Sequence, residues 1–427
     1  MELRVAGGRR LAGHVGVGGS RNSALAVMAA SLLAEGETTI DNVPDNGDVR
    51  LMGQILQGIG VGVRRSDPHV LQVRVRRLIH HEPDYELSKM IRASSLLIGP
   101  ILARTGKARV AMPDGEQIGP RPMDLHLKGM RALGADVAVE HGYVAASVSR
   151  LSGARIYLDF PSVGATESIM MGACLAKGTS IIENAAKEPE VVDLANFLTL
   201  MGAAIRGAGT DAIRVDGVDS LSPVTYSVIP DRIEAATILS AGLITRGRVR
   251  VMDVIPTHLD SVLSKLAEMG AELDIGPDYV ELAMAGPIRA CDTKTGPYPG
   301  FPTDMQPQLS AVMSLAAGVS VLTESVFDNR FLQVDELRRM GALMRLESRS
   351  LIIEGIERLT GAMVRAVDPA TGAALILAGL AAEGETSLSG VEQIDRCYEG
   401  ICGKLNRLGA CVSRFGATHA SAVGEEK

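Results

Sequence analysis

The sequence predicts a two-domain α/β protein built from six copies of one folding unit. Two series of glycines, each recurring six times at similar spacing, indicate the repeats. Between them, stretches with helical periodicity alternate with short stretches of strand character, which is typical of the α/β class. The chain of 427 residues is long enough for two to four domains, at about 100–200 residues each.

The first series places a glycine between two apolar residues at the end of a helix-like stretch. Its members follow one another on the order of 70 residues apart, at Gly60, Gly134, Gly202, Gly270, Gly341 and Gly409. The second series ends an earlier helix-like stretch, at Gly36, Gly106, Gly178, Gly247, Gly318 and Gly384. Glycine commonly ends helices because it adopts the left-handed conformation easily. Each unit therefore reads strand, helix, strand, helix, strand, strand.

Six units divide naturally into three plus three. The boundary falls near residues 222–231, where Pro223 and Pro230 interrupt the pattern. We therefore expect a first domain at 18–229 and a second at 230–427. The N-terminal strand at 1–17 precedes the first unit. If it completes the second domain, the chain crosses between the domains twice.

Composition excludes several classes of function. The net charge is −7 without a basic run, which argues against a nucleic-acid partner. The five cysteines lack CxxC spacing, so we expect reduced thiols in a cytoplasmic protein, with no metal site and no cofactor. The apolar stretch at 24–34 is too short to span a bilayer, so we expect no membrane partner. Small-molecule substrates remain, and the oligomeric state stays open.

Polar residues gather in the first turn of the first helix of every unit. These turns lie at 19–22, 88–92, 162–166, 231–234, 303–306 and 368–371. Ser and Asp there are good N-caps, and capping alone could explain Asp231 and Asp368. Arg21, Arg92 and Arg232 instead oppose the helix dipole. A bound phosphate or carboxylate would explain these arginines, and so would salt bridges to neighbouring acids.

A loop at 112–122 contains three prolines and two glycines, which exclude a helix. It carries one carboxylate, Glu116, and one guanidinium, Arg121. Arg330 and Arg396 recur at comparable places in units five and six. Their recurrence indicates a shared site.

Several stretches resemble the UDP-N-acetylglucosamine enolpyruvyl transferases, a branch of the EPSP synthase-like proteins. They are residues 121–126, 162–166, 183–190, 230–234, 301–306 and 329–331. The similarity runs from Leu3 to about Arg414. It implies two inside-out α/β barrel-like domains, each of three βαβαββ units, joined by a double chain crossover. The unit count agrees with the count from the glycines.

The resemblance implies transfer of the enolpyruvyl group from phosphoenolpyruvate to a hydroxyl of a uridine nucleotide, UDP-N-acetylglucosamine first among them. Phosphate leaves through addition and elimination, a step of bacterial peptidoglycan synthesis. Asp304 would take the acceptor proton, and Arg121 and Arg396 would bind phosphoenolpyruvate, with Arg92 and Arg330 nearby. The implied substrate-binding set is completed by Arg21, Asn22, Pro122, Met123, Asp124, Leu125, Ser162, Val163 and Gly164.

The sequence departs from this family at positions that carry chemistry. Glu116 stands where the loop usually has cysteine or aspartate, and a carboxylic acid can donate a proton if burial raises its pKa. Arg21 replaces a lysine, Ala370 an arginine and Phe160 a lysine. Residues 44–48 lack the lysines usual there.

Three functions stay open from the sequence. The first is a transferase acting on UDP-N-acetylglucosamine with Glu116, Asp304 and Arg396 as catalytic residues. The second is a paralogue acting on another uridine nucleotide such as UMP. The third is a non-catalytic nucleotide-sugar binder. Because fosfomycin alkylates the loop cysteine of the family, a chain with Glu116 there is expected to be insensitive to it.

Overall fold

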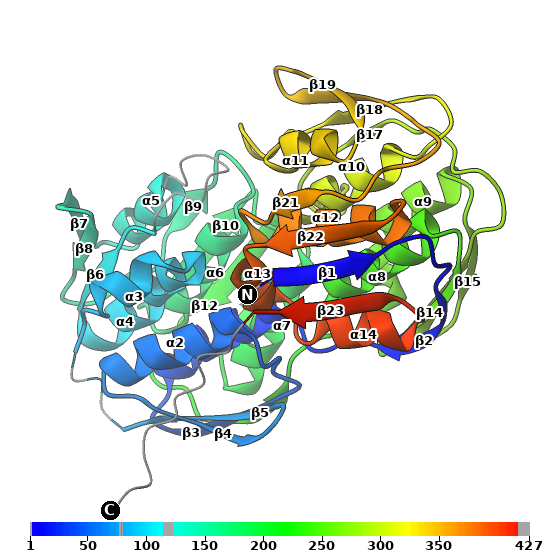
Figure 1. Cartoon of the computed structure of the whole chain (residues 1–427). Coiled ribbons are helices and arrows are strands. Elements are labelled where there is room, and N and C mark those ends of the chain that lie inside the picture. Colours follow the sequence, from blue (N-terminus) through cyan, green and yellow to red (C-terminus); the bar gives the residue numbers. More distant parts are fainter. Residues whose placement is uncertain (1, 77, 79, 114–122, 417–427) are drawn as a thin grey trace, which may run out of the picture.

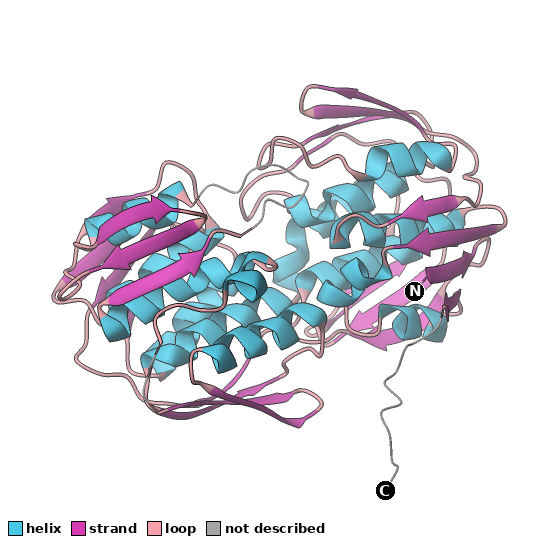
Figure 2. Cartoon of the chain, turned by 60° about the vertical axis from the view of Figure 1, so that its left-hand side comes forward, coloured by secondary structure: helices cyan, strands magenta, loops and turns pink. Residues whose placement is uncertain are grey.

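The computed structural model describes residues 2–76, 78, 80–113 and 123–416 and has two lobes (Figure 1). Each lobe has its own hydrophobic core. The core of lobe one gathers buried residues between Ala24 and Val228. The core of lobe two gathers residues between Ala235 and Val412, together with Leu3, Val5, Leu11 and Val15 from the N-terminus. In both lobes the helices lie inside and the strands outside (Figure 2), which is the inside-out arrangement expected.

Lobe one contains units one to three. Unit one has α1 (Arg21–Ala30), η1 (Ser31–Leu33), β3 (Gly36–Asp41), α2 (Gly47–Gly58), β4 (Gly62–Asp67), β5 (Val70–Val75) and β13 (Thr225–Ser227). Unit two has α3 (Tyr85–Lys89), η2 (Arg92–Leu97), α4 (Ile98–Thr105), β6 (Lys107–Ala111), α5 (Asp124–Ala132), β7 (Asp136–Glu140) and β8 (Tyr143–Ser147). Unit three has β9 (Arg155–Tyr157), α6 (Val163–Cys174), β10 (Thr179–Glu183), α7 (Pro189–Leu200), β11 (Ala204–Arg206) and β12 (Ala212–Asp216).

Lobe two contains units four to six. Unit four has β2 (Ala12–Gly16), α8 (Arg232–Ile244), β14 (Arg248–Met252), η3 (Pro256–Leu259), α9 (Asp260–Glu268), β15 (Glu272–Ile275) and β16 (Tyr279–Ala283). Unit five has β17 (Thr293–Lys294), η4 (Thr303–Met305), α10 (Gln306–Met313), β18 (Val319–Thr323), α11 (Gln333–Arg339), β19 (Leu343–Glu347) and β20 (Ser350–Glu354). Unit six has β21 (Met363–Arg365), α12 (Pro369–Ala381), β22 (Glu385–Ser389), α13 (Val391–Cys397), α14 (Ile401–Arg407), β23 (Cys411–Phe415) and β1 (Glu2–Ala6).

The described part of the unit-two sheet has three strands in the order β6-β8-β7, and the five four-stranded sheets share one strand order, shown by unit three as β9-β10-β12-β11. The first two strands are parallel and the other pairs antiparallel. Three strands reach their sheets from distant parts of the chain. β1 lies between β22 and β23, in the place that β12 has in unit three. β2 pairs with β14 in unit four, and β13 pairs with β3 in unit one. The first strands of units one and four are thus exchanged between distant parts of the chain.

The two connections between the lobes run side by side. The nitrogen of Ser20 donates to the carbonyl of Ile229 at 2.7 Å, and the nitrogen of Asp231 donates to the carbonyl of Gly18 at 2.9 Å. Gly19 lies between them, where a Cβ atom would be 1.6 Å from the carbonyl oxygen of Asn42. Only glycine fits such an approach. The double crossover is therefore a paired strap at the base of the cleft between the lobes.

One helix from each unit occupies the lobe centre, namely α1, α4, α6, α8, α10 and α12. In α1, α6, α8, α10 and α12 nearly every residue is buried, because small side chains let the helices pack closely. At Gly99 of α4, a Cβ atom would lie 2.2 Å from the carbonyl oxygen of Ser168 in α6. Helices that are apolar on all sides belong inside a core.

The predicted helix stops are left-handed with one exception. All glycines of the first series have φ between 91° and 110°. In the second series Gly247 is not left-handed, and the positive φ of 51° falls on Arg246 instead. Gly247 is nevertheless needed, because a Cβ atom there would lie 2.1 Å from the carbonyl oxygen of Leu11. Its role is to let β2 approach.

Candidate active site

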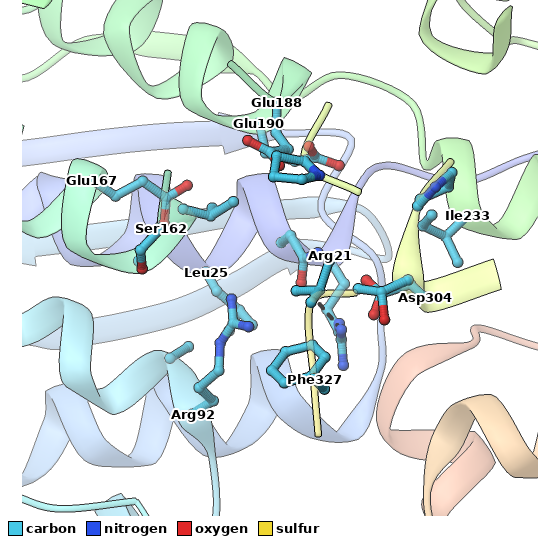
Figure 3. A pocket seen from close by; sticks show the side chains of 18 of the residues that line it. Arg21, Leu25, Arg92, Ser162, Glu167, Glu188, Glu190, Ile233, Asp304 and Phe327 are labelled. Carbon is cyan, nitrogen blue, oxygen red and sulfur yellow. Dashed lines mark hydrogen bonds between the residues drawn. The ribbon is translucent and has the colours of Figure 1, made fainter. Parts of the chain in front are cut away.

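A cavity of about 530 Å³ lies between the lobes. Its wall contains residues from the start of a helical segment in every unit: Arg21 in α1, Arg92 in η2, Val163 in α6, Arg232 in α8, Thr303 in η4 and Pro369 in α12. Helix starts present free N–H groups and a positive dipole end, both of which attract anions. Figure 3 shows Arg21, Arg92, Ser162 and Asp304 around this cavity.

The structure brings together twelve of the predicted site residues. The wall includes Arg21, Asn22, Arg92, Met123, Asp124, Leu125, Ser162, Val163, Gly164, Asp304, Arg330 and Arg396. Phe160 and Ala370, the positions noted as lost cations, also line it. Glu116, Arg121 and Pro122 lie outside the described residues.

Asp304 forms an ion pair at the cavity wall. Its Oδ1 is 2.7 Å from Nη2 of Arg330, whose Nη1 donates to Oγ1 of Thr303 at 3.1 Å. Burial alone would raise the pKa of Asp304, but the charges of Arg330 and Arg21 outweigh it and hold the pKa well below its usual value. Asp304 is therefore ionised at neutral pH and able to accept a proton.

Asp48 joins the two lobes, and sequence reasoning missed it. Its Oδ2 accepts from Nη1 of Arg21 at 3.0 Å, and its Oδ1 accepts from Nε of Arg396 at 2.9 Å. Asp48 is in α2 of lobe one and Arg396 in α13 of lobe two. Gly47 permits this approach, since a Cβ atom there would lie 3.1 Å from Cα of Arg396. Asn46, the N-cap of α2, orients the turn.

The three arginines that open helices have different surroundings. Arg232 pairs with Glu190 of α7 through Nε and Nη2, at 2.9 and 3.3 Å; the Glu190 side chain is buried and that of Arg232 is 11% exposed. Arg21 pairs with Asp48. For these two arginines the salt-bridge alternative holds. Arg92 is exposed, and its guanidinium has no hydrogen-bond or ion-pair partner among the described residues, so it remains available to an anion.

Capping accounts for the two aspartates at helix starts. Asp231 accepts from the nitrogens of Ile233 and Glu234 at 2.8 and 3.0 Å. Asp368 accepts from the nitrogen of Thr371 at 2.7 Å. Both carboxylates therefore satisfy the open N–H groups of their helices.

The second helix of unit six is broken, and the break places Arg396 in the cavity wall. α13 ends at Cys397 and α14 starts at Ile401, with Gly400 left-handed at φ 59°. Nη2 of Arg396 donates to the carbonyl of Met90 in lobe one at 3.1 Å. A continuous helix would not leave this end free to meet the other lobe.

A buried carboxyl, Glu167 of α6, also lines the cavity. Burial raises its pKa to about 8, Arg92 opposes that shift, and Glu190 and Glu188 add to it. His126, which lines the same cavity, is buried, and burial, with help from Arg92, lowers its pKa to about 4. At neutral pH this part of the wall therefore carries less charge than its residue types suggest.

We expect Glu167→Gln to remove a pH dependence of stability. The folded pKa of about 8 exceeds the usual 4.5, so the folded state binds the extra proton between these values. Stability is then lost as pH rises through that window. We compare the melting temperature of the variant with that of the wild type. The variant minus wild-type difference should be about 3–10 °C larger at pH 9 than at pH 5. Calorimetry across pH tests this; a difference that stays constant would contradict it, and Glu86→Gln at an exposed carboxyl is the control.

Comparison with known proteins agrees with this architecture. The chain belongs to the EPSP synthase (3-phosphoshikimate 1-carboxyvinyltransferase) family, which it matches over residues 5–405. Within that class it is 49% identical over 413 residues to the UDP-N-acetylglucosamine 1-carboxyvinyltransferase of Gloeobacter violaceus, covering 96% of this chain and 90% of that protein. It is also 49% identical over 424 residues to UDP-N-acetylglucosamine 1-carboxyvinyltransferase 1 of Carboxydothermus hydrogenoformans, covering 99% of both.

Solved structures give the same fold. The enolpyruvyl transferase NikO from Streptomyces tendae superposes with a TM-score of 0.88 at 25% identity, covering 96% of this chain and 98% of that one. EPSP synthase from Acinetobacter baumannii superposes with a TM-score of 0.74 at 18% identity, covering 97% and 100%. The predicted inside-out fold of six units is thereby confirmed.

The described residues contain neither a membrane-spanning helix nor a metal-binding cluster. No helix within residues 2–76, 80–113 and 123–416 is long and apolar enough to cross a membrane. Over the same part of the chain, no group of three or more His, Cys, Asp and Glu side chains is placed to hold a metal ion.

Proposed function

We propose that this protein transfers the enolpyruvyl group of phosphoenolpyruvate to a hydroxyl of UDP-N-acetylglucosamine, with release of phosphate. The observation that carries the proposal is one cavity in which six helix starts meet Arg21, Arg92, Arg330 and Arg396 beside the ionised Asp304. Two polyanionic substrates suit such a wall. The names of relatives about 49% identical support the acceptor.

The nucleotide would lie against lobe one. Met123, Asp124 and Leu125 form one side of the cavity, and the start of α6 forms another. Ser162 caps α6 by accepting from the nitrogen of Ala165 at 3.4 Å. The remaining N–H groups at this helix start are suited to a diphosphate. Arg92, exposed in the same cavity, would add a positive charge.

Phosphoenolpyruvate would lie nearer the strap, where Arg21 and Arg396 approach each other through Asp48. The acceptor oxygen forms a bond to C2 of phosphoenolpyruvate while C3 gains a proton, giving a tetrahedral ketal. The ketal then loses phosphate from C2 and a proton from C3, which restores the double bond. In this scheme Asp304 takes the proton of the acceptor hydroxyl. Glu116 is proposed as the acid that gives C3 its proton.

The reaction belongs to peptidoglycan synthesis in the cytoplasm under this proposal. Phosphate release from phosphoenolpyruvate tests it, with UDP-N-acetylglucosamine, UMP and uridine offered separately and the product mass checked. Release with UDP-N-acetylglucosamine and a matching enolpyruvyl mass gain would support the proposal. Turnover with UMP alone would show that the acceptor is UMP and not UDP-N-acetylglucosamine. The absence of release with all three would contradict a transferase acting on these acceptors.

We expect turnover to persist after incubation with fosfomycin. The loop position carries Glu116, which has no sulfur to open the epoxide. Residual activity and the intact mass after one hour with excess fosfomycin provide the measurement. Time-dependent inactivation together with a covalent mass gain would contradict the prediction.

A further inference from the structure

A buried carboxylate behind the cavity wall joins two parts of that wall. Glu324 directly follows β18, its side chain is fully buried, and it does not line the cavity. Its Oε1 accepts from Oγ1 of Thr295 at 2.8 Å and from the nitrogens of Val326 and Phe327 at 2.7 and 3.1 Å. Its Oε2 accepts from Oγ1 of Thr303 at 2.8 Å. Four donors therefore fix the position of one carboxylate.

The place of Glu324 in the repeat is unusual. In four other units the residue that follows the corresponding strand is left-handed, with φ between 54° and 76°: Asn42 after β3, Asn184 after β10, Asp253 after β14 and Gly390 after β22. Such a residue turns the chain by its own backbone conformation. The backbone of Glu324 is not left-handed, and its side chain instead accepts the N–H groups two and three residues further on. The segment 325–332 that follows is thus shaped by a side chain.

This segment carries Arg330 into the cavity wall. Nη1 of Arg330 donates to Oγ1 of Thr303 at 3.1 Å, and Nη2 lies 2.7 Å from Oδ1 of Asp304. Because the hydroxyl of Thr303 gives its proton to Glu324, the lone pairs of its oxygen remain for Arg330. Hydrogen bonds arranged in such a chain strengthen one another. The contacts that start at Glu324 therefore end at Asp304, the group proposed to take the acceptor proton.

We infer that Glu324 is a positioning residue of the transferase reaction, which orients Arg330 on Asp304. It acts through the hydroxyl of Thr303, and its contacts with two backbone nitrogens shape the neighbouring wall, where Phe327 lies near Asp304 (Figure 3). The inference rests on the proposed function, in which Asp304 is the base. Glu324 lies outside the wall, so it affects the reaction only through its neighbours.

The variant Glu324→Gln changes one end of this side chain and keeps the other. Oε1 takes three donors, so we expect the amide oxygen to occupy its place and the amide nitrogen to face Thr303. Two N–H donors, one from the new amide and one from Arg330, then compete for one hydroxyl oxygen. Arg330 loses its support and moves away from Asp304.

The ionisation of Asp304 reports this movement without any substrate. Removing the negative charge of Glu324 would by itself lower the pKa of Asp304, because a nearby like charge opposes ionisation. Displacement of Arg330 has the opposite effect, since burial raises the pKa of Asp304 and Arg330, Arg21 and Arg92 hold it low. We therefore expect the pKa of Asp304 to rise in Glu324→Gln by about one unit or more.

The measurement is an NMR titration of the full-length protein labelled at the aspartate carboxyl carbons, with the Asp304 signal assigned by Asp304→Asn. Glu324→Asp keeps the charge but is one CH₂ group too short to reach Thr303, so it should raise the pKa of Asp304 as well. Glu354→Gln, at the exposed end of β20 in the same sheet, is the control and should leave it unchanged. A pKa of Asp304 that falls or stays the same in Glu324→Gln would overturn the inference. If that variant does not fold, a wild-type pKa in Glu324→Asp has the same meaning.

Two substitutions of Thr303 test the path of the effect. Thr303→Val removes the hydroxyl and should raise the pKa of Asp304, whereas Thr303→Ser keeps the hydroxyl and should not. Adding Glu324→Gln to Thr303→Val should raise the pKa no further, and a further rise as large as that of Glu324→Gln alone would exclude the path through Thr303.

Turnover gives a second readout of the same variant. Glu324→Gln should lower kcat by about ten- to a hundredfold, as expected for a displaced reacting group, while the KM for the nucleotide changes little. A fall in nucleotide affinity with unchanged kcat would contradict positioning of the base. Failure of the proposed function would appear as no turnover in the wild type, whereas the titration of Asp304 decides this inference without turnover.

Discussion

Asp304→Asn is expected to lower kcat by about 10²–10⁴-fold, the range for loss of a proton-transferring side chain. The amide keeps the shape of the side chain but cannot take the proton of the acceptor hydroxyl. In the free enzyme, Arg330 and Arg21 keep Asp304 ionised against the effect of burial. The variant therefore loses a group that is in its reactive form before substrate binds.

Steady-state kinetics with both substrates varied give the measurement. Nucleotide affinity by titration calorimetry should change far less than kcat, since the helix starts that face the nucleotide remain. Loss of the 2.7 Å pair leaves Arg330 without its carboxylate, so thermal unfolding must be recorded to separate damage to the fold. Asp335→Asn, at an exposed carboxylate of α11, is the matched control and should retain full activity. A kcat for Asp304→Asn within tenfold of the wild type would exclude Asp304 as the base.

The sequence predicted the repeats because glycine conformation is a local property. Stops such as Gly60 and Gly409, with φ of 91° and 95°, leave a signature that repeats wherever the same turn is needed. The exchange of the first strands between units one and four was harder to predict from the sequence. β2 and β13 are short, and their pairing with β14 and β3 depends on which lobe each reaches after the strap. That the N-terminal strand completes lobe two is predicted only because this strand precedes the first of the six units.

The charged residues of the site could be predicted from the sequence, but their ion-pair partners could not. Cations at helix starts are unusual in any sequence, so Arg21, Arg92 and Arg232 could be singled out. Which of them already has an anion depends on tertiary packing. The partner of Arg232 is Glu190, which lies in the other lobe. The contact between Gly47 and α13 brings Asp48 to Arg396, and no local pattern records that contact.

Asp48→Asn is expected to raise the KM for phosphoenolpyruvate by about ten- to a hundredfold. Hydrogen bonds to charged groups contribute about 1.5–3 kcal/mol, and every 1.4 kcal/mol corresponds to a factor of ten. Two effects oppose each other here. Removing a negative charge strengthens the attraction of Arg21 and Arg396 for an anion. It also leaves two neighbouring guanidinium groups to repel each other across the lobes.

We expect the loss of positioning to outweigh the gain in attraction, because Asp48 bonds to both arginines from opposite lobes at 3.0 and 2.9 Å. A fall in KM would show that attraction wins instead. Asp45→Asn, three residues away, removes an exposed pair with Arg50 and should leave KM unchanged, as most surface pairs contribute little. A double-mutant cycle with Arg396→Gln isolates the contact: if Asp48 acts through Arg396, the two changes together raise KM less than the product of their separate effects.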